Sequence, residues 1–107
     1  MEKKETWINK DTDELFRAII SLEDVREARN FFRDLMTEGE ILECANRWKV
    51  VHMLEDNVPY ITIAKETGMS STTIARISKW VKDGKGGYRS MLKKQKNSRA
   101  LKDNCAT

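Results

Sequence analysis

The chain has 107 residues, of which 39% are hydrophobic and 35% charged, and its formal net charge at pH 7 is +3. This length favours one domain of common size, and a chain this polar builds only a modest core by itself. It contains no apolar run long enough to cross a membrane, and its first ten residues lack the apolar segment of a secretion signal. We therefore expect a cytoplasmic protein with no membrane partner.

The first two predicted helices follow a short arm, residues 1–10, which we expect to dock through Trp7 and Ile8. Asp11 or Thr12 is suited to cap the first helix, because a short polar side chain accepts hydrogen bonds from the unpaired N–H groups of a first turn. The segment SLED at residues 21–24 has the form of a capping box and predicts the start of a second helix that ends near residue 35.

A third, longer helix is predicted from the Thr-x-x-Glu box at residues 37–40 to about Asp56. Its apolar residues cover well over half of its circumference: Ile41, Leu42, Cys44, Ala45, Trp48, Val50, Val51, Met53 and Leu54. Two interpretations remain open. The helix either contacts both its own bundle and a second subunit, or it is buried inside a monomer.

Residues 58–81 have the pattern of a helix-turn-helix. Pro59 suits the first turn of a short helix, Gly68 suits the tight turn that ends it, and Ser70 suits the N-cap of a second helix. The turn is then three or four residues long. Small and branched apolar residues occupy the positions that face inward in such a motif: Ala64, Ile74 and Ile77.

The outward face of the second helix of this motif carries hydroxyls, one methyl group and two cations: Ser71, Thr72, Thr73, Ala75, Arg76 and Lys79. Side chains of these types contact phosphates and base edges in the major groove of DNA. The sequence therefore predicts a DNA-binding helix-turn-helix. The alternative is a structural helical corner whose polar face is only solvated.

The charges are distributed unevenly along the chain. Residues 1–43 carry twelve acids and seven bases, whereas residues 79–107 carry nine bases and two acids. A glycine-rich segment at residues 83–87 ends the helix-turn-helix pattern, and a last short helix is expected from Tyr88 to about Gln95. The cationic segment that begins on the outward face of the second helix favours attraction to phosphate.

These patterns suggest an arm at residues 1–10, a single helical DNA-binding domain at 11–97 and a basic, disordered tail at 98–107. The helix-turn-helix occupies about residues 59–81.

Residues suited to catalysis or metal binding are few. Cys44 and Cys105 lie far apart without the spacing of a metal or redox site, and His52 is the only histidine. We interpret Cys44 as filler of the core or of an interface, and Cys105 as part of the tail. Because no paired carboxylates, activated nucleophile or metal set can be named, we expect neither an enzyme nor a metal site.

From Leu35 to about Trp80 the chain resembles the Trp repressor superfamily, most closely the Trp repressor-like YerC/YecD group. The similarity lies in LMTEGEILECANRWKVVHMLEDNVPYITIAKETGMSSTTIAR, with its Leu-x-Thr-x-x-Glu entry and its glycine turn leading to Thr-Ile-x-Arg. The resemblance implies an all-α fold of six helices with a helix-turn-helix. It also implies an intertwined homodimer in which the first, third and last helices interlock with the partner.

Together with the pattern above, the resemblance marks a set of candidate DNA-binding residues: Lys65, Ser70, Ser71, Thr72, Thr73, Ala75, Arg76 and Lys79. In the same family tryptophan lies between two arginines, which the resemblance places at Arg47 and Arg76. A threonine at the start of the long helix corresponds to Thr37. Without a ligand, these arginines would be a helix-surface cation and a phosphate contact.

Two residues depart from the family's tryptophan pocket. Ile77 stands where the family has a glycine after the second arginine, and Trp80 stands where it has a serine. Because a branched side chain would clash with the indole ring, we expect no tryptophan corepressor and no other cofactor. Two alternatives remain: Ile77, with Trp48 or Trp80, fills the space and fixes the reading heads without a ligand, or the pocket accepts another, unknown effector.

The leading functional hypothesis is a sequence-specific transcriptional regulator, a repressor, that binds double-stranded DNA as a homodimer. The alternative is a helical protein-protein adaptor whose helix-turn-helix holds a protein partner. The acidic first two helices and the arm around Trp7 motivate this second hypothesis.

Overall fold

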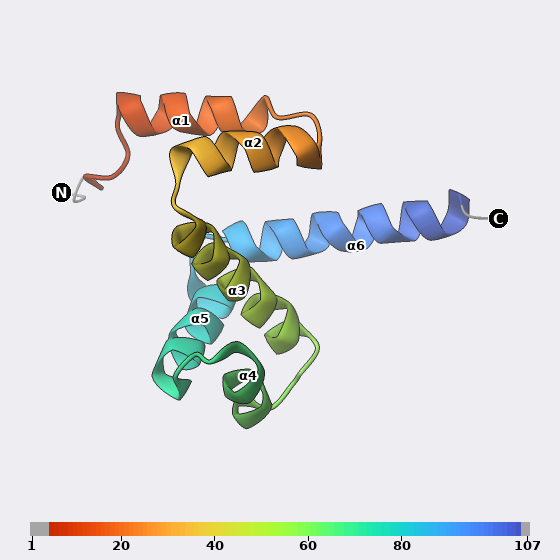
Figure 1. Ribbon diagram of the computed structural model, residues 1–107. Coiled ribbons are helices and arrows are strands. Elements are labelled where there is room, and N and C mark those ends of the chain that lie inside the picture. The colour runs from red at the N-terminus through yellow and green to blue at the C-terminus, as the bar shows by residue number, and fades with distance from the viewer. Residues whose placement is uncertain (1–4, 106–107) are drawn as a thin grey trace. The chain divides into compact units, whose positions relative to one another are not determined.

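The computed structural model describes residues 5–105, with side chains through residue 97, and all regular structure in that range is helical. The helices are α1 (Lys10–Ile20), α2 (Val25–Leu35), α3 (Glu38–Glu55), α4 (Tyr60–Thr67), α5 (Ser71–Asp83) and α6 (Gly87–Cys105) (Figure 1). The prediction of an all-α, six-helix fold is confirmed. The chain divides into two compact units, Met1–Ile41 and Leu42–Thr107, so the single domain expected at residues 11–97 is shared between them.

The cap of α1 is Asn9, and not Asp11 or Thr12 as predicted. The Asn9 side chain accepts a 3.0 Å hydrogen bond from the Thr12 N–H, and the Thr12 hydroxyl accepts a 2.9 Å bond from the Asn9 N–H. This reciprocal pair satisfies two N–H groups of the first turn at once, which a cap placed two residues later would leave unpaired.

The capping box predicted at residues 21–24 is wrong, because α2 begins later. Ser21 instead ends α1, and its hydroxyl donates a 2.6 Å hydrogen bond to the Ala18 carbonyl. Asp24 is the cap of α2 and accepts a 2.8 Å bond from the Glu27 N–H. The two N-caps, Asn9 of α1 and Asp24 of α2, follow the same rule, because each side chain accepts a hydrogen bond from the N–H three residues onward.

The first unit buries little of its own apolar surface. The arm docks as predicted through Trp7, whose ring meets the ring of Phe16 edge-on with centroids 6.4 Å apart. Ile8, however, remains 45% exposed. Neither α1 nor α2 contains a buried residue.

The buried core lies in the second unit and draws on four helices: Val50, Val51, Ile63, Ile74, Ile77, Val81 and Leu92. Ile74 is 0% and Ile77 1% exposed, which confirms their inward orientation. Three of the seven residues lie on α5, so this helix is at the centre of the unit. Such fully buried aliphatic side chains each contribute about 1.5–3 kcal/mol relative to exposure.

The long helix α3 begins as predicted. The Thr37 N–H donates a 2.9 Å hydrogen bond to the Glu40 carboxylate, and the Thr37 hydroxyl accepts a 3.2 Å bond from the Glu40 N–H. Further along, only Val50 and Val51 of α3 are buried. Cys44 is exposed, which excludes the core alternative of its interpretation and leaves the interface alternative a prediction, and Leu42 is 68% exposed.

The first half of the last helix, α6, contacts the second half of α3. The rings of Trp48 and Tyr88 stack with centroids 6.2 Å apart, and Glu55 forms 3.3 Å ion pairs with Arg89 and Lys96. Helical backbone continues to Cys105, so this helix is longer than the short one expected to end near Gln95, and the disorder expected in the tail stays a prediction. Among the described residues, no helix is long and apolar enough to span a membrane.

Candidate nucleic-acid interface

A three-residue turn at residues 68–70 joins α4 to α5 and forms the predicted helix-turn-helix. Gly68 has φ 74°, in the left-handed region, and its N–H donates a 2.9 Å hydrogen bond to the Ala64 carbonyl. An added Cβ would meet no atom within 4 Å, so the requirement for glycine comes from the backbone conformation and not from lack of space.

The start of α5 is capped by Ser70, as predicted. Its hydroxyl accepts a 3.2 Å hydrogen bond from the Thr73 N–H and lies 3.0 Å from the Thr73 hydroxyl. Thr73 is half-buried, whereas Ser71 and Thr72 beside it are exposed. The side chains of Ser71 and Thr72 are therefore exposed without a capping role, while those of Ser70 and Thr73 hydrogen-bond within the first turn.

The remaining candidate residues of the motif are presented to solvent. Ala75, Arg76 and Lys79 are exposed on α5, and Lys65 is exposed on α4. The buried residues of α5 lie on its other face, so the helix shows a clear division between core and solvent. All eight candidate DNA-binding residues thus lie on one helix-turn-helix within one unit.

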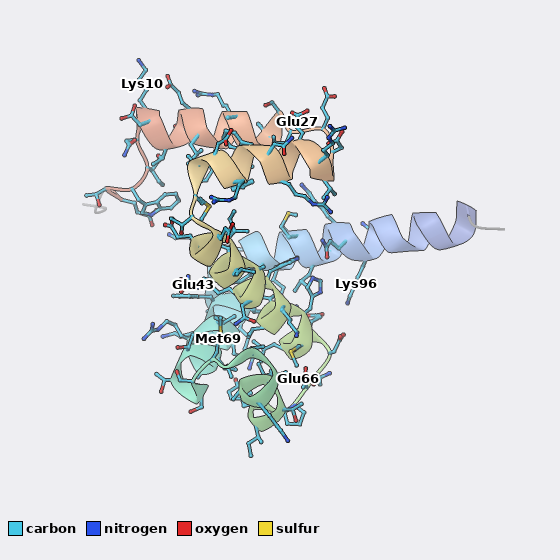
Figure 2. All side chains as sticks on the ribbon, viewed as in Figure 1. Lys10, Glu27, Glu43, Glu66, Met69 and Lys96 are labelled. Atoms are coloured by element: carbon cyan, nitrogen blue, oxygen red, sulfur yellow. The ribbon has the colours of Figure 1, made fainter. Side chains whose placement is uncertain are left out.

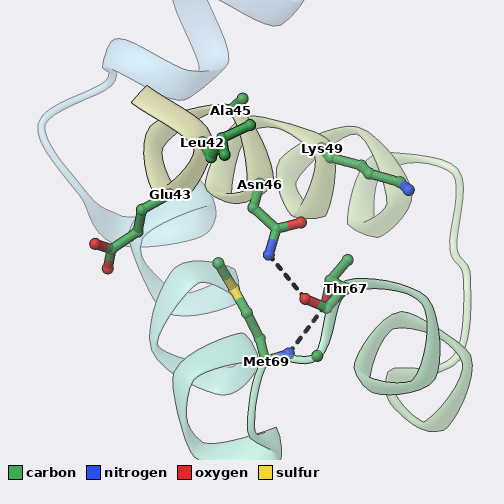
Figure 3. A pocket seen from close by; sticks show the side chains of 8 residues that line it. Leu42, Glu43, Ala45, Asn46, Lys49, Thr67 and Met69 are labelled. Atoms are coloured by element: carbon green, nitrogen blue, oxygen red, sulfur yellow. Dashed lines mark hydrogen bonds between the residues drawn. The ribbon is translucent and has the colours of Figure 1, made fainter. Parts of the chain in front are cut away.

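The turn is also held against α3, through a contact that the sequence pattern did not indicate. The Asn46 side chain donates a 2.8 Å hydrogen bond to the Thr67 carbonyl, and the Thr67 hydroxyl accepts a 3.3 Å bond from the Met69 N–H (Figure 3). These residues line an open groove of about 590 Å³ between α3 and the turn. Asn46 therefore ties the turn of the helix-turn-helix to α3.

Four of the residues that the resemblance assigns to a tryptophan pocket lie in the second unit: Arg47, Arg76, Ile77 and Trp80. Ile77 is 1% exposed and belongs to the core, and Trp80 is 45% exposed. The Arg47 guanidinium forms a 3.0 Å ion pair with Glu43, one turn earlier on α3. Thr37 belongs to the first unit, where it caps α3.

Basic side chains continue beyond the helix-turn-helix. Lys82, Lys93 and Lys94 are exposed, and Lys96 projects from α6 (Figure 2). Arg89 and Lys96 share the single carboxylate of Glu55, which only partly offsets their charge. Among the described residues there is no group of three His, Cys, Asp or Glu side chains that could hold a metal ion.

The sequence signature of the Trp repressor protein family matches residues 10–96. The chain belongs to the Trp repressor family. It is 38% identical over 89 residues to the uncharacterized protein YerC of Bacillus subtilis (strain 168), a match that covers 83% of this chain and 86% of YerC.

Two solved structures show the same fold as this Trp repressor family member. A TrpR-like protein from Eubacterium eligens ATCC 27750 is 36% identical with a TM-score of 0.78, over 83% of this chain and 92% of the other. A candidate Trp repressor from Staphylococcus aureus is 33% identical with a TM-score of 0.80, over 90% and 96% of the two chains. Family membership points to a DNA-binding transcriptional regulator, a class that is not enzymatic.

Proposed function

We propose that this member of the Trp repressor family is a sequence-specific repressor of transcription that binds DNA as a homodimer and does not respond to tryptophan. The observation that carries the proposal is the exposed polar and cationic face of α5, held by the Gly68 turn, the Ser70 cap and Asn46. A rigid helix with this surface suits the major groove, because groove recognition needs side chains held at fixed positions.

The side chains on this face divide into two roles. Lys65, Arg76 and Lys79 carry positive charge and would neutralise phosphates, which supplies affinity but little sequence preference. Ser71, Thr72 and Ala75 offer short hydroxyls and a methyl group for base edges. Ser70 and Thr73 contribute indirectly, because their mutual hydrogen bonds shape the first turn of α5.

The homodimer is supported by apolar surface that this chain leaves uncovered. Within the described residues, Ile20 is 82%, Val25 66% and Leu42 68% exposed, and α1 and α2 bury no residue. Helices with one apolar face need a partner to cover it, and a second copy is the commonest one. Two recognition helices related by a two-fold axis would read half-sites about 34 Å apart, so the operator should be a pseudopalindrome.

The proposed independence from tryptophan is supported by two side chains that already have partners within this chain. Ile77 is packed in the core, and Arg47 is paired with Glu43. An indole beside Ile77 would have to displace a branched, fully buried side chain, which costs several kcal/mol, on the order of 2–5. Isothermal titration with L-tryptophan should therefore show no binding in the micromolar range, and a micromolar affinity would contradict this part of the proposal.

The central experiment is a genomic pull-down of DNA fragments by the purified protein, at two salt concentrations and with or without L-tryptophan. We expect enriched fragments that share a pseudopalindrome, are lost at the higher salt and do not depend on tryptophan. Arg76→Ala should weaken binding to all sequences, whereas Lys94→Ala removes the same charge away from the motif and should change binding less. Thr72→Ala should chiefly relax base preference.

The result that overturns the proposal is an absence of enrichment under every condition by a folded protein. If that protein instead forms a stable complex with another protein, the helix-turn-helix acts as an adaptor. Equal losses on every sequence for Arg76→Ala and Thr72→Ala would contradict the division of roles.

A further inference from the structure

A polar hollow of about 560 Å³ lies in the second unit where the end of α3, the start of α4, the second half of α5 and the start of α6 meet. Its volume is within the range of about 300–1,000 Å³ that is typical of small-molecule sites. It shares no lining residue with the groove beside the turn, and it contains none of the candidate DNA-binding residues.

Ser78 contributes a buried polar side chain to this hollow, which an ordinary surface depression lacks. It is 8% exposed and is the one buried polar residue among those described. Its hydroxyl makes no hydrogen bond to another described residue, yet no polar side-chain atom there is both sealed from water and unpaired. The Ser78 hydroxyl therefore opens into the hollow that it lines, where it is available to a ligand.

The charges around the hollow favour an anion. Glu55, whose side chain is 22% exposed, is shared by Arg89 and Lys96 at 3.3 Å each. Arg89 has further N–H groups, because a guanidinium carries five donors. Lys82 adds a second cation to the lining, against the one carboxylate of Glu55. Positive charge thus exceeds negative charge beside the Ser78 hydroxyl.

The rest of the lining favours a ligand with an organic body. Leu54, Val58 and Val81 contribute apolar surface, and Tyr60 contributes an aromatic ring with a hydroxyl. An inorganic anion would leave this surface without contacts. We propose that the hollow is a binding site for a small carboxylic acid with an apolar body, its carboxylate held by Ser78, Lys82 and Arg89.

The hollow lies beside both helices of the helix-turn-helix, so a ligand bound there would contact the proposed DNA-binding element. Tyr60 lies on α4 and Ser78 on α5, so one ligand contacts both helices of the helix-turn-helix. Occupancy would stiffen their arrangement and change DNA affinity. This regulatory consequence rests on the proposed function, whereas the binding site itself does not.

The test uses the full chain labelled with ¹⁵N and titrated with sodium phenylacetate, an aromatic carboxylate. The controls are phenylacetamide, which has the same body without charge, and inorganic phosphate, which has charge without the body. We expect phenylacetate alone to shift the amide signals of Ser78, Lys82 and Arg89, with a Kd of about 1 mM or tighter for a ligand of this size.

Matched variants separate this site from general attraction to a basic protein. Lys82→Gln should weaken phenylacetate binding about fivefold, because a charge-assisted hydrogen bond is lost. Lys94→Gln removes an equal charge from α6 outside the hollow and should leave the affinity unchanged. Ser78→Ala should also weaken binding, and circular dichroism should show that all three variants keep their helices.

The proposal is overturned if phenylacetate causes no shifts at these residues, if phenylacetamide or phosphate binds equally well, or if Lys82→Gln and Lys94→Gln behave alike. DNA retention is measured separately on the same samples. Retention of DNA without phenylacetate binding would refute this site alone. Phenylacetate binding without retention of DNA would refute the proposed function and leave the site in place.

Discussion

The side-chain amide of Asn46 on α3 donates a 2.8 Å hydrogen bond to the backbone carbonyl of Thr67, the last residue of α4. The two residues are 21 positions apart, and the bond is partly buried. Carbonyl groups at the end of a helix lack partners within the helix, so a side chain from elsewhere can satisfy one of them. This bond holds the turn of the helix-turn-helix against the long helix α3.

Asn46→Ala should therefore destabilise the protein by about 1–2 kcal/mol, since a partly buried carbonyl loses its partner. Lys49→Ala is the matched control, because Lys49 lines the same groove on α3 and is exposed. Urea unfolding monitored by circular dichroism measures both. Equal losses of stability in the two variants would show that the bond to Thr67 contributes nothing specific.

Gly68→Ala should destabilise the protein by about 1–2 kcal/mol, because φ 74° is costly for a residue with a Cβ. The added methyl group meets no atom within 4 Å, so a steric clash does not contribute. Gly68→Asn should cost less, since asparagine tolerates the left-handed region better than alanine. Thermal unfolding of the two variants would reveal this order, and the reverse order would contradict the conformational explanation.

Truncation of Ile77 should show that it is a core residue. Ile77→Val should cost about 0.5–1.5 kcal/mol and Ile77→Ala about 2–5 kcal/mol, because the side chain is 1% exposed. Ile61→Ala is the control on the neighbouring helix, where the side chain is 84% exposed and the change should stay within about 0.5 kcal/mol. Chemical unfolding measures all three, and an Ile77→Ala cost as small as that of Ile61→Ala would place Ile77 outside the core.

Glu40 should make stability depend on acid pH. The Thr37 backbone N–H, which donates a 2.9 Å hydrogen bond to the Glu40 carboxylate, and secondly the Thr37 side-chain hydroxyl hold the pKa of Glu40 below its ordinary value. A carboxylate with a lowered folded-state pKa stabilises the fold above its unfolded pKa, about 4.3 for glutamate. That contribution is lost as the pH falls through the lowered pKa.

Glu40→Gln keeps a hydrogen-bonding side chain but cannot ionise. The variant should be less stable than the wild type near neutral pH, and the difference should disappear in acid. Urea unfolding at about pH 7 and about pH 2 checks this, and carbon NMR of the carboxyl group measures the pKa of Glu40 directly. A stability difference that does not change between these pH values would contradict the explanation.

Much of the local structure of the helix-turn-helix and of the start of α3 can be predicted from residues that are close in the chain. The Gly68 turn, the Ser70 cap and the Thr37–Glu40 box were all predictable, because each depends on hydrogen bonds over three or four residues. The same kind of reasoning misplaced the caps of α1 and α2. Several polar residues near each start could serve as the cap, and the choice between Ser21 and Asp24 depended on where α1 ended.

The sequence by itself determined the helical class, the helix-turn-helix and the division of α5 into a core face and a solvent face, since helix periodicity fixes which residues share a side. Tertiary structure alone decided that Asn46 meets Thr67, that Glu55 pairs with Arg89 and Lys96, and that Ser78 opens into a hollow. It also decided that Cys44 and Leu42 are exposed. These contacts join residues that are distant in the chain, and they form only when packing of the apolar side chains brings separate helices together.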